Sequence, residues 1–181
     1  MEPDATHKFI EVYHEGYEKY VGEEFGKTVL GFRGDEPDYS IRGGIPWTPK
    51  IFTEFKKRKG YDVQPYVASC YTVIYNEEQR RVRADYWDVW SSLFAENYFG
   101  VQGDWCADHN LKYMVHLNHE ENMVSMANSE GDFFKDMRPV QIPGVDAIWH
   151  QIWPRDAIPV FPKYASSAAH LFGRQRSFTE S

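Results

Sequence analysis

The sequence has few cysteines, no long apolar run and none of the common nucleotide or serine-esterase signatures. Its two cysteines, Cys70 and Cys106, are too few for a disulfide framework and lack the spacing of a zinc site, and the sequence leaves open whether they pair. No apolar run approaches the roughly 18 residues of a transmembrane helix. A Gly-rich phosphate loop and a GxSxG elbow are also missing, so nucleotide and serine-esterase chemistry have no support.

Positive charge is also scarce. The chain carries 20 basic and 27 acidic residues, a formal net charge of −7. Its basic run, 56–59, falls at the end of a predicted helix, where cations complement the helix dipole. We therefore expect neither nucleic acid nor an anionic membrane surface as a partner.

Aromatic side chains, in contrast, are abundant. The 6 Trp, 12 Tyr and 12 Phe make up 17% of the chain, enough to build the core of one domain of 181 residues. Aromatic rings also stack on the faces of sugar rings, so the same composition suits a carbohydrate-binding cleft. Trp149, next to His150 in a predicted strand, is a candidate for such a contact.

Helical and strand patterns alternate along the chain. Helices are predicted from Asp4 to before Gly22, from Thr48 to Gly60, from about Glu78 to His109, and from Pro162 to Phe172. Strands are predicted at Thr28–Phe32, Leu111–Leu117, Val145–Ile152 and Arg176–Glu180, and the turn Pro143-Gly144 precedes the third. Strands separated by helices indicate an α/β fold with a parallel sheet.

The number of strands indicates part of a barrel. A complete TIM (β/α)₈ barrel needs about 200 to 250 residues and eight strands. This chain has 181 residues and four predicted strands. We therefore expect a single segment, 1–181, that forms a partial TIM barrel and is truncated at both ends.

Two glutamates at strand ends are the candidate catalytic pair. Glu36 lies at the end of the first predicted strand and Glu180 at the end of the fourth, so in a barrel they would face each other across the mouth. Glycoside hydrolysis needs one protonated and one ionised carboxyl group on either side of the scissile bond. The alternative is that both glutamates are solvated, and Asp35-Glu36-Pro37 would also make a good turn.

A second polar group follows the second predicted strand. His116, His119 and Glu120 could bind sugar hydroxyls, and Glu120 with asparagine and carbonyl oxygens would suit calcium. The three could also build a metal-dependent hydrolase, although HLNHE lacks the spacing of the HExxH zinc motif.

Four segments together resemble the catalytic barrel of the family 106 glycoside hydrolases, the α-L-rhamnosidase family. These segments are 4–37, ending in GDEP, then 81–121, ending in NHEE, then 139–148, PVQIPGVDAI, and 166–181, ending in SFTES. The resemblance covers nearly the whole chain and implies strands 4 to 7 of the barrel, with their helices.

The resemblance also implies a mechanism. It suggests an inverting hydrolase of rhamnosides in which Glu36 is the general acid after strand 4 and Glu180 the general base after strand 7. Asp35 would support Glu36, and Glu120 would bind calcium or substrate at strand 5. The substrate would be a carbohydrate, the location secreted or periplasmic, and no organic cofactor is implied.

One rival hypothesis belongs to a different class of protein. A non-catalytic carbohydrate-binding or pseudo-enzyme segment would keep the substrate contacts predicted for Asp35, His116, His119, Trp149 and His150 but lack productive carboxylates. Binding of rhamnose-containing sugars without turnover would favour it.

Overall fold

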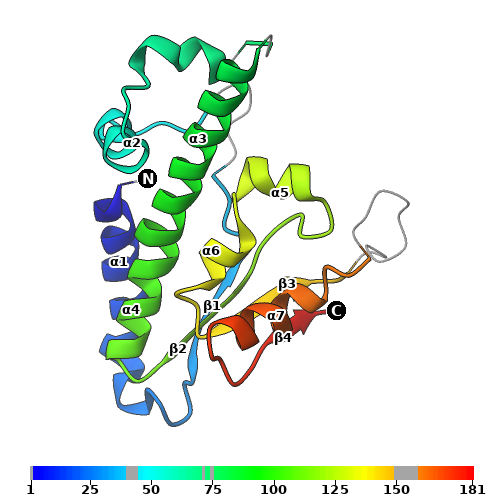
Figure 1. Cartoon of the computed structure of the whole chain (residues 1–181). Coiled ribbons are helices and arrows are strands. Elements are labelled where there is room, and N and C mark those ends of the chain that lie inside the picture. The colour runs from blue at the N-terminus through cyan, green and yellow to red at the C-terminus, as the bar shows by residue number, and fades with distance from the viewer. Residues whose placement is uncertain (1, 40–44, 71, 74–75, 149–158) are drawn as a thin grey trace.

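A four-stranded parallel sheet with helices packed against it forms the centre of the computed structural model, which describes residues 2–39, 45–70, 72–73, 76–148 and 159–181 (Figure 1). In chain order the elements are α1 (Pro3–Val21), η1 (Gly22–Glu24), β1 (Gly31–Asp35), α2 (Ile51–Lys59), η2 (Gln64–Cys70), α3 (Glu77–Phe94), the π-helical η3 (Ala95–Gly100), α4 (Val101–Asp108), β2 (Lys112–His116), α5 (Met123–Ser129), α6 (Phe133–Met137), β3 (Ile142–Asp146), α7 (Lys163–Leu171) and β4 (Phe178–Glu180).

The strands follow one another across the sheet in the order β1-β2-β3-β4, all parallel. Asp35 pairs with His116 at the end of β1 and β2, and Asp146 pairs with Glu180 at the end of β3 and β4. The carboxyl ends of all four strands therefore meet at one edge, where parallel α/β folds bind ligands. The predicted α/β class and parallel sheet are confirmed, and this strand order is compatible with a partial barrel.

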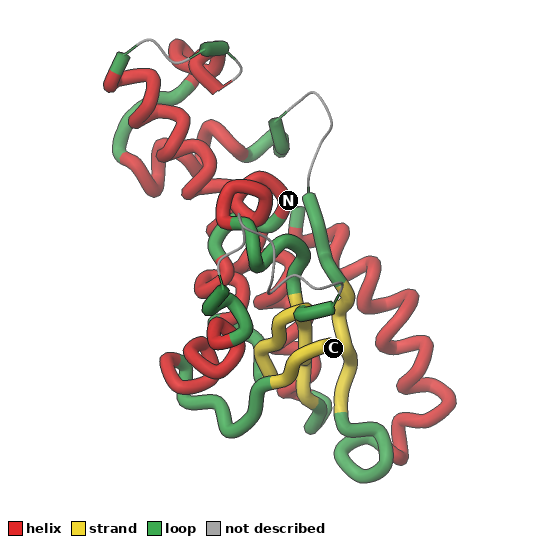
Figure 2. Tube along the Cα trace, turned by 90° about the vertical axis from the view of Figure 1, so that its right-hand side faces the viewer, coloured by secondary structure: helices red, strands yellow, loops and turns green. Residues whose placement is uncertain are grey.

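The two faces of the sheet have different surroundings. Phe32 of β1 packs toward α1 and α4, with its ring 4.2 Å from that of His14 and 6.0 Å from that of Trp105. Because side chains alternate along a strand, Arg33 lies on the opposite face. Figure 2 shows that opposite face of the strands toward the viewer, with the helices beside and behind it.

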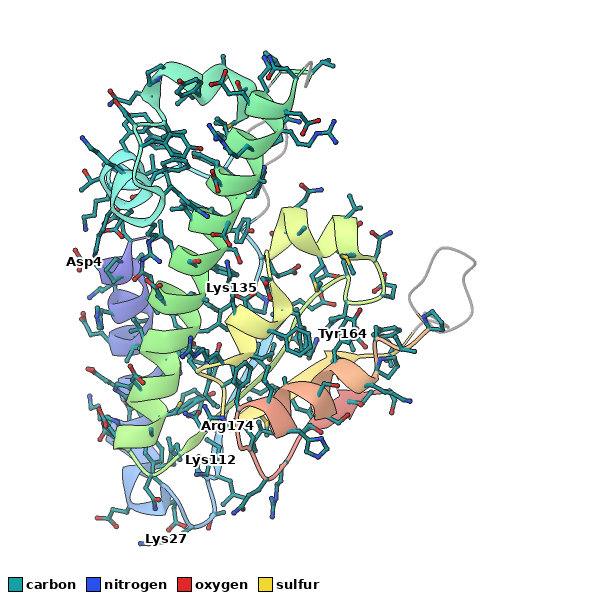
Figure 3. The ribbon with its side chains drawn as sticks, viewed as in Figure 1. Asp4, Lys27, Lys112, Lys135, Tyr164 and Arg174 are labelled. Carbon is teal, nitrogen blue, oxygen red and sulfur yellow. The ribbon has the colours of Figure 1, made fainter. Side chains whose placement is uncertain are left out.

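The helices bury the face of the sheet that carries Phe32. α4 packs against β2, and α7 packs against β3 and β4. The core between them includes the fully buried side chains of Phe94, Phe99, Tyr113 and Val115. Burying each aromatic or aliphatic side chain contributes about 1.5 to 3 kcal/mol before entropy is counted. Lys135 of α6 pairs with the Asp88 carboxylate and ties that short helix to α3 (Figure 3).

The predicted helices agree closely with the structure. The long helix expected from 78 to 109 is a continuous helical path through α3, η3 and α4. Asn76 caps its start by accepting a hydrogen bond from the N–H of Gln79, at 2.9 Å. α5 and α6 were not predicted, although each begins with a capping side chain, Asn122 and Asp132 respectively.

Two strands lie at other positions than expected. β1 begins at Gly31 rather than Thr28, because the chain forms a tight turn before it in which Gly26 has a φ of 74°. β3 ends at Asp146, and the Pro143-Gly144 pair predicted as a turn lies inside it. Gly144 is needed there because a Cβ at this position would come within 2.3 Å of the Phe178 ring.

The two cysteines do not form a disulfide. Cys70 and Cys106 are both buried, and both are free thiols. Within the part of the chain that the structure describes, no helix is long and apolar enough to cross a bilayer.

Candidate active site

Three strands bring Asp35, His116 and Glu180 together at the carboxyl edge of the sheet. The Nε2 atom of His116 lies 2.9 Å from Asp35 Oδ1 and 2.9 Å from Glu180 Oε2. His116 is 1% exposed, whereas the side chain of Asp35 is 74% exposed and that of Glu180 36%. The site therefore has a buried imidazole at its base and two accessible carboxylates above it.

Arg33 joins this group from β1. Its Nη2 atom lies 3.0 Å from His116 Nε2 and 3.3 Å from Asp35 Oδ1, and it contacts Glu180 Oε2 directly. The guanidinium also lies over the Phe178 ring, 5.7 Å from its centroid. One cation thus faces the two carboxylates, and an aromatic ring of β4 supports it.

The hydrogen bonds of His116 restrict its tautomer. Its Nδ1 lies 3.0 Å from the carbonyl oxygen of Leu117, which can only accept, so Nδ1 carries a hydrogen atom. In the neutral ring Nε2 therefore accepts from Arg33. In the imidazolium it donates to Asp35 or Glu180 instead. Either form gives His116 a partner among the groups around it.

Glu36 also lies close to His116. A carboxylate oxygen of Glu36, a ring nitrogen of His116 and a carboxylate oxygen of Asp146 all lie within 4.8 Å of one another. Glu36 has a φ of 45°, a left-handed conformation that costs a non-glycine residue roughly 1 to 2 kcal/mol. This conformation takes the chain away from the strand and leaves the Glu36 carboxylate exposed at its end. Glu36 and Glu180, far apart in sequence, thus both approach the same imidazole.

Two buried carboxyl groups lie behind the site. Glu120 Oε1 accepts from the N–H of Leu117, at 2.9 Å, and of Asp146, at 3.4 Å, so this side chain links the ends of β2 and β3. Glu130 Oε1 accepts from the N–H of Asn118 at 3.1 Å. Burial raises the pKa of each group to about 8.

The remaining predicted contacts are placed as follows. His119 lies in the turn after β2, half-buried, with a left-handed φ of 64°. Trp149 and His150 lie outside the described residues, and β3 ends three residues before Trp149. The structure therefore joins Asp35, His116 and Glu180 directly and bears on neither Trp149 nor His150.

Two groups of side chains at this edge could hold a cation. They are Asp35–His116–Glu180 and Glu36–His116–Asp146, and within the described ranges neither group includes His119 or Glu120. Arg33 already supplies a positive charge to the first group. Calcium takes six to eight oxygen ligands, and the carboxylates of this edge together with the unpartnered Oε2 of Glu120 are oxygen donors of that kind.

Sequence reasoning missed Arg33 and Asp146. Arg33 stands two residues before Asp35, so strand alternation already puts both side chains on one face. Asp146 was missed because the third strand was predicted to end at Ile152, which put Asp146 inside it. In the structure that strand ends at Asp146 itself. A predicted strand that ended six residues earlier would have identified Asp146 by the same edge rule.

Comparisons with known proteins bear on the fold and on the family of this chain. The chain resembles the structure of a rhamnosidase from Novosphingobium sp. PP1Y with a TM-score of 0.77 and 23% identity, over 99% of this chain and 17% of that one. The chain therefore spans about 17% of the length of the rhamnosidase it matches. Among curated proteins no sequence matches it. The alpha-L-rhamnosidase model of the glycoside hydrolases matches residues 1–181, and the chain accordingly belongs to that family.

Proposed function

We propose that this chain forms half of the catalytic barrel, strands 4 to 7, of an inverting glycoside hydrolase that cleaves a rhamnosyl or similar deoxy-sugar linkage. The observation that carries the proposal is the approach of Glu36 and Glu180 to the same buried imidazole, His116, at the carboxyl edge of the sheet. Family membership and the rhamnosidase fold support the substrate class.

The proposed reaction uses the two glutamates in different protonation states. Glu36 gives its proton to the glycosidic oxygen as the bond to the anomeric carbon breaks. Glu180 takes a proton from a water molecule whose oxygen forms the new bond on the opposite face of the sugar. This single displacement inverts the configuration and needs carboxyl groups about 6.5 to 9.5 Å apart, so that water fits between them.

The charges around the two glutamates support these roles. A general base must carry a negative charge, and the guanidinium of Arg33 compensates that charge at Glu180. Glu36 instead lies beside the carboxylate of Asp146, and its charge is one of the causes that raise the pKa of buried Glu130. We therefore assign the role of general acid to Glu36, which has a carboxylate rather than a guanidinium beside it.

The proposal includes calcium as the metal and substrate contacts through Asp35, His116 and His119. Glu120 would offer calcium its Oε2, the oxygen without a partner among the described residues. The bound ion would supply positive charge that holds sugar hydroxyls. The side chains of this edge would bind and orient the sugar around it.

The test uses the full-length protein that carries this chain and an aryl α-L-rhamnoside. Glu36→Gln and Glu180→Gln are each expected to lower kcat by at least about 10³-fold, since each removes a proton-transfer group from the reaction. NMR of the first-formed sugar should show the inverted anomer, and chelation followed by metal analysis should identify calcium.

Each outcome has a defined consequence. Normal turnover by either variant would remove that glutamate from the mechanism, and a retained anomer would exclude inversion. Sugar binding without any turnover by the wild type would favour a non-catalytic carbohydrate-binding role. Stoichiometric zinc in place of calcium would favour a metal-dependent hydrolase.

A further inference from the structure

We infer that Arg33 is a positioning residue for the general base, holding the Glu180 carboxylate and the His116 ring in one arrangement. The inference rests on the proposed function, in which Glu180 activates water. It adds a residue that touches neither the sugar nor the reacting water in that scheme.

The path of the Arg33 side chain is the first argument. Arg33 belongs to β1 and Glu180 to β4, and β2 and β3 separate these strands in the sheet. The guanidinium nevertheless contacts Glu180 Oε2 and passes His116 of β2 at 3.0 Å. Arg33 therefore links the first and last strands across the open face, and through His116 it also reaches the second.

The oxygen atom that Arg33 uses is the second argument. The contacts of Glu180 with Arg33 and with His116 both involve Oε2. The other oxygen, Oε1, is thereby left to accept the proton from water. Fixing one oxygen of a carboxylate orients the other, and a misplacement of about 1 Å at such a group can cost 100-fold in rate.

The support under the guanidinium is the third argument. Arg33 Cζ lies 5.7 Å from the centroid of the Phe178 ring, a cation–π distance. The Phe178 ring in turn occupies space that exists because residue 144 has no side chain. Two neighbouring strands thus shape the position of the arginine, although its side chain is 43% exposed.

This arrangement differs from an ordinary surface ion pair. Exposed ion pairs contribute little to stability, because water and salt screen the two charges. Here a planar guanidinium meets an imidazole nitrogen, two carboxylates and a ring face together. Lysine can supply the charge but not the planar fork, so the exchange is not conservative at such a site.

The experiment measures kcat and KM on an aryl α-L-rhamnoside with the full-length protein. Arg33→Ala is expected to lower kcat about 100-fold with little change in KM, because the lost interaction acts on the base rather than on the sugar. Arg33→Lys is expected to have a kcat between those of the alanine variant and the wild type.

A matched control separates this effect from the loss of any arginine ion pair. Arg58 of α2 contacts the Glu96 carboxylate through two nitrogens, at 2.8 and 2.6 Å, on the helical side of the molecule. Arg58→Ala should therefore leave kcat and KM unchanged. Circular dichroism and thermal unfolding of every variant give the folded fraction used to normalise kcat.

Several results would overturn the inference. Wild-type kcat in both Arg33 variants would do so, as would losses that disappear once kcat is expressed per folded molecule. A wild-type kcat in Arg33→Lys alone would also overturn it, because lysine lacks the planar fork that the inference makes responsible for the effect. An inactive wild type refutes the proposed function and this inference with it, whereas an active wild type with a normal Arg33→Ala variant refutes the inference alone.

Discussion

Glu130 is a carboxyl group buried directly behind the carboxyl edge of the sheet. It is fully buried, and its Oε2 accepts a hydrogen bond from the Ser129 hydroxyl. Burial raises its pKa from 4.5 to about 8, and the charges of Asp38 and Glu36 act in the same direction. The group therefore folds in its protonated form at neutral pH, at a cost relative to the ionised form in the unfolded chain.

This cost predicts how stability depends on pH. A raised folded-state pKa means that stability is fully present below about pH 4.5 and is lost as pH rises toward about 8. The slope is at most about 1.4 kcal/mol per pH unit for one group. Glu130→Gln keeps an acceptor for the Asn118 N–H and removes the titration, so it should flatten this decline in thermal unfolding experiments.

The control for this prediction is an exposed glutamate. Glu77, in the first turn of α3, is exposed, and Glu77→Gln should leave the pH dependence unchanged. If Glu130→Gln and Glu77→Gln follow the wild-type curve equally, Glu130 does not fold in its protonated form.

At the scale of elements, helix α1 packs against the sheet with a buried histidine, His14. His14 is 2% exposed, and neither ring nitrogen has a hydrogen-bond partner among the described residues. Its ring packs 4.2 Å from Phe32 of β1 and 5.0 Å from Trp105 of α4. Burial, with a smaller contribution from His109, the residue after α4, lowers its pKa to about 4.

Docking of α1 should therefore weaken in mild acid. A depressed histidine pKa means that stability is present above the unfolded value of 6.5 and is lost as pH falls toward about 4. Hydrogen exchange of the α1 amides is expected to accelerate between about pH 7 and pH 5, relative to the intrinsic rate. His14→Phe fills the same aromatic site without a titrating group and should abolish the acceleration.

The comparison helix for this measurement is α7, which has no buried histidine. Its exchange, corrected in the same way, should show no such change in either variant. Equal acceleration in α1 of the wild type and of His14→Phe would contradict the assignment to His14.

At the scale of the whole molecule, the chain exposes surfaces that usually find a partner. Phe9, Tyr13 and Tyr17 form a stripe along α1 and are 41%, 49% and 50% exposed. In the described part of the sheet, β1 pairs only with β2 and β4 only with β3, so each has an unpaired edge. Exposed apolar stripes and open strand edges both favour association.

The isolated 181-residue chain is therefore expected to self-associate or aggregate. Size-exclusion chromatography with light scattering checks this directly. The double variant Tyr13→Glu, Tyr17→Lys should reduce association, since it places charges in the aromatic stripe. A monomeric chain with a cooperative melt would contradict the prediction.

Local pattern alone determined much of this molecule. Helical periodicity and helix-ending glycines identified α1, α2, the long path from α3 to α4, and α7, because these helices carry their own signals. The parallel sheet followed from the alternation of strands and helices. Polar residues at strand ends, Asp35, Glu36, His116 and Glu180 among them, were expected at one sheet edge because parallel strands end together, and these four residues lie there.

Only the tertiary structure decided the strand boundaries and the partners of each charge. β3 begins at Ile142 because its register with β2 and the Phe178 ring over Gly144 select those residues, and neither signal is local. Glu120 points inward because backbone N–H groups of Leu117 and Asp146 converge there. Arg33 meets Glu180 across 147 residues of chain because the sheet curves their strands toward each other, and no local pattern encodes that curvature.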